Sequence, residues 1–247
     1  LLNLPETESI QISRQPSITF LDKDGRIIAS YGDIYGKSIK YNKLPQNLIN
    51  AVIVTEDKRF FNHYGVDLKG VLRATYVNLK ERRIVQGGST ITQQLAKNLF
   101  LTPERSFTRK LHELILSLWL EIRFSKEQIL SIYLNRVYLG SGTYGVQAAS
   151  EKYFNKKVEN LNLYECAVIA SLLKAPSRYN PIANKKLSKE RASLVLENMI
   201  RSKMISRGNV NKAKYNNQKY TKFTAAPKST RYFIDWLLPR VKSYVGE

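Results

Sequence analysis

The sequence predicts a mainly α-helical protein with a small β element at its N-terminal edge. Two observations support this fold class. Apolar residues recur at helical spacing through most of the 247 residues, and a strand-like alternation stands out near the start. The chain is long enough to form one sizeable core. A hydrophobic fraction of 43% and the modest glycine and proline counts exclude disordered and collagen-like proteins.

The first expected elements are a hairpin and two helices. In residues 16–30, strand-forming residues flank Asp22–Lys23–Asp24–Gly25, whose glycine can take a positive φ. A helix is predicted from Leu44 to about Phe61, because four apolar residues share one face: Leu48, Ile49, Val52 and Ile53. Asp67 is the expected N-cap of a second helix that ends in the charged run 80–83.

The later elements are also helices. They are expected at residues 91–101, from Thr102–Pro103 to Phe124, after the N-cap Ser125, at 163–173 and over 185–215, with an aromatic and apolar stretch at 231–245. The helix ending at Phe124 has a broad apolar face: Leu111, Leu114, Ile115, Leu118 and Ile122. Its narrow polar stripe is Lys110, Glu113, Ser117 and Glu121. A helix that is apolar nearly all round is usually central in its domain, so we expect its two acids to face a cleft.

Composition and charge narrow the function classes. Cys166, the one cysteine, excludes an internal disulfide and cysteine-based metal sites. The net charge of +20 predicts an anionic partner: nucleic acid, an anionic membrane surface or a pyrophosphate-bearing substrate. No zinc finger, RRM signature or basic strand with interleaved aromatic residues accompanies the charge, but composition alone leaves all three partners open. The sequence has neither a run of 18 apolar residues nor a signal peptide, and it starts at Leu1 without methionine; we expect a piece of a longer protein.

The first candidate site is the segment from Glu56 to Gly65, in which acids, bases and His63 follow an otherwise apolar helix. A carboxylate that is partly withdrawn from water is a better general base, which suits Glu56. On this pattern alone, solvated acids at a helix end are the commoner explanation. His63 alone is better explained as a hydrogen-bonding residue that fixes the turn at Gly65 than as a base.

The second candidate site is Gly87–Gly88–Ser89–Thr90–Ile91–Thr92–Gln93–Gln94. Two glycines before a hydroxyl-rich helix start present free backbone N–H groups, which can seat a phosphate or sugar hydroxyls. A simply capped helix explains the pattern equally well. Lys97 and Arg105 lie downstream and could reach the same anion, although each alone is more typical of a solvated surface charge.

The third candidate site is Arg109–Lys110–Leu111–His112–Glu113. Glu113 lies four residues after Arg109, so an ordinary ion pair along the helix is one interpretation. Its place in the narrow polar stripe of an apolar helix favours a cleft instead.

These segments, in this order, resemble the peptidoglycan glycosyltransferase domain (glycosyltransferase family 51) of class A penicillin-binding proteins and monofunctional transglycosylases. The matching motifs are E-D-x-x-F-x-x-H-x-G at 56–65, G-G-S-T-I-T-Q-Q at 87–94, R-K-x-x-E at 109–113 and K-x-x-I-L-x-x-Y-L-N at 126–135. The resemblance covers about residues 16–204. It implies a lysozyme-like helical fold at the periplasmic, outer face of the bacterial inner membrane.

The resemblance also implies a reaction and its residues. The family polymerises lipid II into glycan chains with inversion and releases undecaprenyl pyrophosphate. Glu56 corresponds to the base that deprotonates the acceptor hydroxyl, and Glu113 to the glutamate that supports the donor pyrophosphate, often with a divalent cation (Mg or Mn), for which Glu113 is the expected ligand. Lys97 and Arg105 match phosphate-binding positions. The expected substrate-binding set also contains Asp57, His63, Ser89, Thr90, Gln93, Gln94, Arg109, Lys110 and His112. The partners implied are lipid II, the nascent glycan chain, the membrane surface and moenomycin, an inhibitor that resembles the donor; the resemblance implies no nucleic-acid partner.

One residue departs from the family pattern. Lysine commonly precedes the second glutamate, and here this position is His112, a weaker counter-charge for phosphate near neutral pH. We also expect residues 66–86 to form a membrane-facing flank, because apolar residues alternate there with lysines and arginines. A core helix with a solvated basic edge would show a similar pattern.

The expected organisation has three parts. Residues 1–40 are a linker with the hairpin, following a missing membrane anchor; 41–215 are the glycosyltransferase domain; 216–247 begin the linker to a missing transpeptidase domain. Two other functions remain open. A lytic enzyme of the same fold would use Glu56 as an acid, but it would have no need for a pyrophosphate seat. A basic module that binds membrane or nucleic acid would not depend on Glu56.

Overall fold

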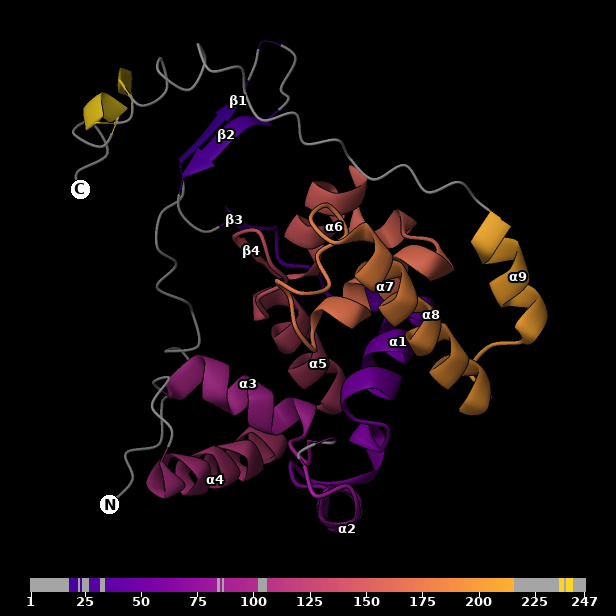
Figure 1. Ribbon diagram of the computed structural model, residues 1–247. Helices are drawn as coiled ribbons and strands as arrows, with labels where there is room; N and C mark the ends of the chain where they lie inside the picture. The colour runs from indigo at the N-terminus through magenta and orange to yellow at the C-terminus, as the bar shows by residue number, and fades with distance from the viewer. Residues whose placement is uncertain are drawn as a thin grey trace.

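The structure is a computed structural model that describes residues 18–21, 23, 27–31, 34–83, 85, 87–101, 106–215, 236–237 and 239–241. It confirms the mainly helical fold class (Figure 1). The helices are α1 (Gln46–Glu56), α2 (Leu68–Lys80), α3 (Ile91–Phe100), α4 (Phe107–Arg123), α5 (Lys126–Arg136), α6 (Val146–Phe154), α7 (Leu163–Leu172), α8 (Lys185–Arg201) and α9 (Arg207–Tyr215). Short 3-10 turns are Tyr41–Lys43, Phe60–Asn62 and Val158–Asn160.

The strands are few and short. The predicted hairpin is confirmed as β1 (Ile18–Leu21) paired antiparallel with β2 (Ile27–Tyr31), with Ile18 opposite Tyr31. The glycine expected at its turn, Gly25, lies outside the described residues. β3 (Ile34–Tyr35) pairs in parallel with β4 (Thr143–Tyr144) and so joins the start of the domain to the segment before α6.

Helix α7 is the centre of the core. Every residue from Tyr164 to Leu172 is buried, and the helix packs against α1, α6, α8 and α9. α1 buries the four apolar residues that predicted it. It ends at Glu56 and not at Phe61, because the backbone of Asp57 leaves the helical region (φ −156°, ψ 81°). The core thus holds the C-terminal end of α1, and with it Glu56, in a fixed place.

Helix caps define where the next helices begin. Asp67 caps α2 by accepting a hydrogen bond from the Gly70 N–H, and Ser125 caps α5, both as predicted. The predicted start of α4 at Thr102 was too early, because Ser106 caps the helix and accepts from the Arg109 N–H. Thr102 and Pro103 themselves lie outside the described residues. The predicted helical stretch 185–215 is confirmed as the pair α8 and α9, whereas most of 216–247 lies outside the described residues.

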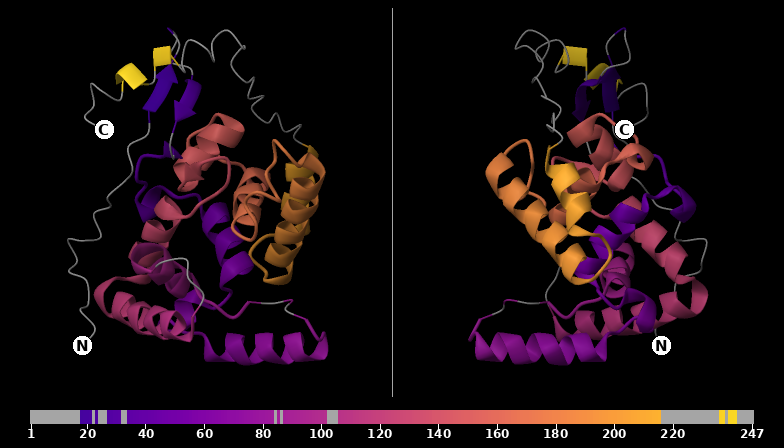
Figure 2. Two further views of the ribbon diagram at one scale, coloured as in Figure 1. Left: turned by 60° about the vertical axis from the view of Figure 1, so that its left-hand side comes forward. Right: turned by 90° about the vertical axis from the view of Figure 1, so that its right-hand side faces the viewer.

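The expectation that α4 is central in the domain was wrong. The helix is not central, because four large apolar side chains are exposed: Phe107 (98%), Leu111, Leu118 and Ile122 (82%). The side chains buried are instead Glu113, Leu116, Ser117, Trp119 and Leu120, so much of the polar stripe faces inward. α2 and α4 lie along one edge of the molecule, opposite α6 (Figure 2). No helix among the described residues has the length and apolar character to span a bilayer.

Candidate active site

The candidate site is an open cleft of about 960 Å³. Its walls come from the end of α1, the start of α2, the segment before α3 and α3 itself, the first turns of α4, the residues that follow α7, and α8. The structure brings nine of the predicted site residues together on these walls: Glu56, Asp57, Ser89, Thr90, Gln94, Lys97, Arg109, Lys110 and Glu113. Basic residues outnumber acidic ones on the lining by seven to four, so the cleft favours an anionic ligand.

Glu56 is the last residue of α1 and is half-buried on the cleft wall. The Gln94 Nε2 group donates a hydrogen bond of 2.9 Å to its Oε2. Glu56 is therefore held from the α3 side and keeps access to the cleft, as a general base requires.

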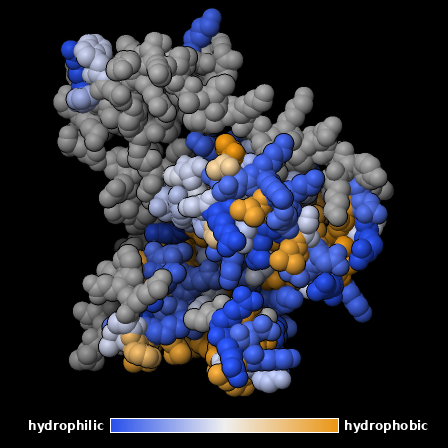
Figure 3. Space-filling view, viewed as in Figure 1, coloured by the Kyte–Doolittle hydropathy of each residue, from blue (hydrophilic) through white to orange (hydrophobic). Residues whose placement is uncertain are grey.

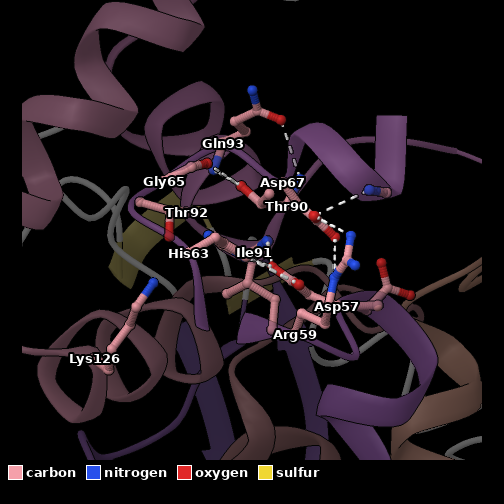
Figure 4. A network of polar contacts seen from close by, with 12 residues as sticks. Asp57, Arg59, His63, Gly65, Asp67, Thr90, Ile91, Thr92, Gln93 and Lys126 are labelled. Atoms are coloured by element: carbon pink, nitrogen blue, oxygen red, sulfur yellow. Dashed lines mark hydrogen bonds and ion pairs between the residues drawn. The ribbon is translucent and has the colours of Figure 1, made fainter. Parts of the chain in front are cut away.

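Asp57, the residue after Glu56 in the sequence, and His63 form a buried network (Figure 4). His63 Nε2 lies 2.9 Å from Asp57 Oδ2, and the Ile91 N–H donates to the same oxygen at 3.1 Å. These contacts join the end of α1 to the first turn of α3. Asp57 is 6% exposed and touches the cleft, whereas His63 does not line it. The structure thus favours the turn-fixing role of His63 over substrate contact.

The segment 87–94 is both a helix cap and part of the cleft wall. Thr90 and Gln93 form a capping box at the start of α3, and the Thr90 hydroxyl donates to the Gly65 carbonyl at 2.6 Å. Gly65 has φ +79°, and a Cβ at this residue would lie 3.0 Å from the Ser117 carbonyl oxygen, so glycine is required there. Gln93 is buried in the cap and does not line the cleft, which leaves residues 87–90 and Gln94 of this segment on the cleft wall.

Glu113 lies across the cleft on α4, only 4% exposed. Its Oε1 accepts a hydrogen bond from the Lys110 ammonium, and its Oε2 lies 3.9 Å from Arg109 Nη1. Lys110 also donates to Ser89 Oγ at 3.2 Å. The acid therefore fixes Lys110 between α4 and the segment before α3, where the ammonium can meet an anion.

A metal site of protein ligands is not formed by the described residues. They contain no group of three or more histidine, cysteine, aspartate or glutamate side chains that could hold a metal ion. Both oxygens of Glu113 already face cations. The divalent cation expected at Glu113 stays a prediction, and in this structure Lys110 and Arg109 supply the positive charge beside that carboxylate.

One more predicted residue, His112, is away from the cleft lining. It is exposed on α4. Arg105 lies outside the described residues.

Sequence analysis did not identify three residues on the cleft wall as site residues, nor a buried residue that contacts Gln94. Lys174, Arg191 and Asn198 line the cleft from the α7 and α8 side. Arg191 shares a helical face with the buried Ser188 and Val195, and a charge on such an apolar face is the signal that could have revealed it. Tyr133, buried on α5, donates to Gln94 Oε1 at 3.0 Å, a contact that only the tertiary structure brings about.

Comparison with known proteins identifies the family. A family model described as transglycosylase matches residues 24–200. Penicillin-binding protein 1A of Aquifex aeolicus is 41% identical over 244 residues, which is 98% of this chain and 33% of that protein. Penicillin-binding protein 1A of Pseudomonas aeruginosa is 44% identical over 200 residues, 81% of this chain and 24% of that protein. The chain thus spans a third or less of the length of these relatives.

A solved structure supports the fold. The crystal structure of penicillin-binding protein 1A from Haemophilus influenzae superimposes with a TM-score of 0.56 at 24% identity, covering 96% of this chain and 25% of that one. With the motifs, the cleft and the family match taken together, the chain belongs to the transglycosylase family, which confirms the glycosyltransferase class predicted from its sequence.

Proposed function

We propose that this domain polymerises lipid II into glycan strands and releases undecaprenyl pyrophosphate. One observation carries the proposal: the same basic cleft contains an accessible carboxylate, that of Glu56 on α1, and a lysine, Lys110 on α4, that is held in place by Glu113. The first suits proton removal from a sugar hydroxyl, and the second suits a pyrophosphate leaving group.

Glu56 acts as the general base in this proposal. It takes the proton of the acceptor sugar's 4-hydroxyl as that oxygen attacks the anomeric carbon of the lipid-linked donor. The bond from this carbon to the pyrophosphate oxygen breaks on the opposite face, so the α linkage becomes β. A positioned general base typically contributes about 10²–10⁴-fold to the rate.

The protein's own cations receive the leaving pyrophosphate. Lys110 and Arg109 stand beside Glu113, Lys97 lines the same cleft, and the backbone N–H groups of residues 87–89 are near. A divalent cation held at Glu113, as the family resemblance implies, would add positive charge beside the leaving pyrophosphate. Moenomycin, which resembles the donor, is expected to bind at this half of the cleft.

The membrane surface is the proposed location of catalysis. α2 exposes Leu68, Leu72, Tyr76 and Leu79, and α4 exposes the four apolar side chains named above. Figure 3 shows apolar side chains gathered at this edge among hydrophilic ones. Apolar side chains surrounded by lysine and arginine suit an anionic bilayer interface. The proposed membrane flank therefore includes α4 as well as residues 66–86, and these exposed side chains support a position of the cleft close to a lipid-linked substrate at the inner membrane.

Incubation of the domain with lipid II, with magnesium or with a chelator, tests the proposal by gel analysis of the products. Glycan polymer in wild type, and its loss in Glu56→Gln, are expected. Cleavage of added glycan without polymerisation would favour the lytic alternative. Binding to anionic vesicles without either reaction would favour a binding module. Polymer formed equally well with the chelator would show that the protein's cations suffice.

A further inference from the structure

We propose that Tyr133 is a positioning residue for Glu56 and acts through the side-chain amide of Gln94. Two hydrogen bonds in series support this assignment: Tyr133 Oη to Gln94 Oε1 at 3.0 Å, and Gln94 Nε2 to Glu56 Oε2 at 2.9 Å. They cross from α5 through α3 to the end of α1. The inference rests on the proposed role of Glu56 as the base.

The direction of the two bonds is fixed by chemistry. An ionised carboxylate can only accept hydrogen bonds, so Gln94 must turn its NH₂ group toward Glu56. The amide oxygen then faces α5, and Tyr133 has to be the donor. If the amide rotated by half a turn, its oxygen would face the carboxylate and the two would repel each other. The tyrosine hydroxyl therefore selects the amide orientation that supports the ionised base.

The environment of Tyr133 keeps it a permanent donor. The side chain is 1% exposed among the core residues of α5. Burial, and then the negative charge of Glu56, raise the pKa of its hydroxyl well above the ordinary value. A buried hydroxyl without a partner would be costly, so this bond is strongly preferred over none. The hydroxyl stays protonated wherever Glu56 can work as a base.

The two hydrogen bonds from Tyr133 through Gln94 to Glu56, called the relay below, hold the base in position and transfer no proton. The proton taken from the sugar hydroxyl resides on Glu56 and then leaves to solvent. Gln94 touches the cleft and Glu56, whereas Tyr133 is not on the cleft lining. Removal of the Tyr133 hydroxyl should therefore affect the ionisation and orientation of Glu56 and leave the ligand-contacting surface unchanged.

The test compares Tyr133→Phe with Tyr153→Phe. Tyr153 is a matched control, because it is also fully buried and its hydroxyl donates to a carbonyl, that of Leu139, at 2.9 Å, away from the cleft lining. In Tyr133→Phe we expect kcat for lipid II polymerisation to fall about 3- to 10-fold, the range for one weakened hydrogen bond, with KM unchanged. The acidic limb of its pH profile should move to higher pH, since the charged form of the base loses support. Tyr153→Phe should change neither.

A measurement without substrate separates this inference from the proposed function. The side-chain amide NMR signals of Gln94, identified by their absence in Gln94→Leu, should change with pH as Glu56 takes up a proton. This change should disappear in Glu56→Gln and should move to higher pH in Tyr133→Phe. The other charged groups that line the cleft are the same in all variants: Asp57, Lys58, Asp67, Arg73, Lys97, Arg109, Lys110, Glu113, Lys174 and Arg191.

The outcomes are distinct. A wild-type domain that makes no polymer, but whose Gln94 signals respond as described, would refute the proposed function and keep the relay. A polymerising Tyr133→Phe enzyme with the kcat and pH profile of Tyr153→Phe would overturn the relay. The relay would also be overturned if the Gln94 amide signals of the wild-type domain did not change with pH as Glu56 takes up a proton. This outcome holds even if Tyr133→Phe fails to fold.

Discussion

Replacement of Glu56 by glutamine should remove most of the polymerising activity and leave the cleft intact. Glutamine has nearly the same shape, and its amide oxygen can still accept the hydrogen bond that Gln94 Nε2 donates at 2.9 Å. The variant therefore loses one negative charge and the ability to take up a proton. Because Glu56 is only half-buried at the end of α1, the cost in folding stability should be about 1 kcal/mol or less.

The size of the effect follows from the role of the base. A loss of about 10²–10⁴-fold in kcat corresponds to about 2.7–5.5 kcal/mol of activation free energy. The rate is measured as glycan formed from lipid II. Moenomycin binding is measured in parallel to show that the part of the cleft beside Lys110 and Arg109, which would receive the donor, is intact. Glu151→Gln is the matched control, because Glu151 also accepts from a glutamine amide, that of Gln147, but is exposed on α6. It should keep the wild-type rate.

Glu113→Gln should lower ligand binding as well as turnover, unlike Glu56→Gln. Its loss releases Lys110 and Arg109 from their carboxylate, so both turnover and moenomycin affinity should fall. A Glu56→Gln enzyme with near-normal turnover would refute the assignment of the base. Equal moenomycin affinity in the two variants would refute the division of labour between the acids while leaving the enzyme class intact.

Three further predictions concern residues outside the cleft wall. His112 is exposed, so His112→Ala should leave the apparent affinity for lipid II unchanged from about pH 6 to 8, a range that brackets the imidazole pKa; a fall of several-fold that His112→Lys restores would instead place it beside the donor. Charge reversal at Arg82 and Arg83 should weaken flotation with anionic liposomes, whereas reversal at Lys186 and Lys189 on α8 should not; equal flotation of both would count against the membrane flank. Glu121→Gln should lower the free energy of unfolding in urea by about 3 kcal/mol or more, because Glu121 pairs with Lys126 at 2.7 Å with both side chains largely buried. The exposed Glu197→Gln should cost less than about 1 kcal/mol, and similar losses in the two variants would refute the argument.

Local signals in the sequence predicted most of the helices and their starts. Asp67 and Ser125 are caps because their side-chain oxygens accept from backbone N–H groups three residues later, a relation contained within one turn. The apolar spacing of α1 is similarly local and identified its buried face. Eight of the nine residues gathered on the cleft wall lie in the motifs, each of which is at or next to the end of one helix, and Lys97 follows the second motif within α3.

Contacts between distant segments could not be predicted in this way. Periodicity identifies the two faces of a helix but not the neighbour that each face meets. The relay from Tyr133 to Glu56 spans 77 residues of sequence in two bonds, of 39 and 38 residues. Arg191 reaches the cleft only because α8 packs against α1 and α7. The same limit explains the wrong expectation for α4. Its broad apolar face suggested a central helix, but the partner proposed for that face is a membrane and not the protein core.

The two faces of α4 connect the proposed chemistry to the proposed location. At about 100° per residue, Leu111 and Ile122 lie on the side of the helix opposite Glu113. Glu113 is buried toward the cleft and the two apolar residues face outward. A helix with its side chains is about 10–12 Å across, so the pyrophosphate seat would stand about one helix diameter from the surface that meets lipid. A substrate whose pyrophosphate is joined directly to a membrane-embedded chain needs a seat at this depth, because the lipid can then stay in the bilayer during transfer. The proposed substrate thus accounts both for the basic cleft and for the exposure of apolar residues on α4, which is unfavourable in water.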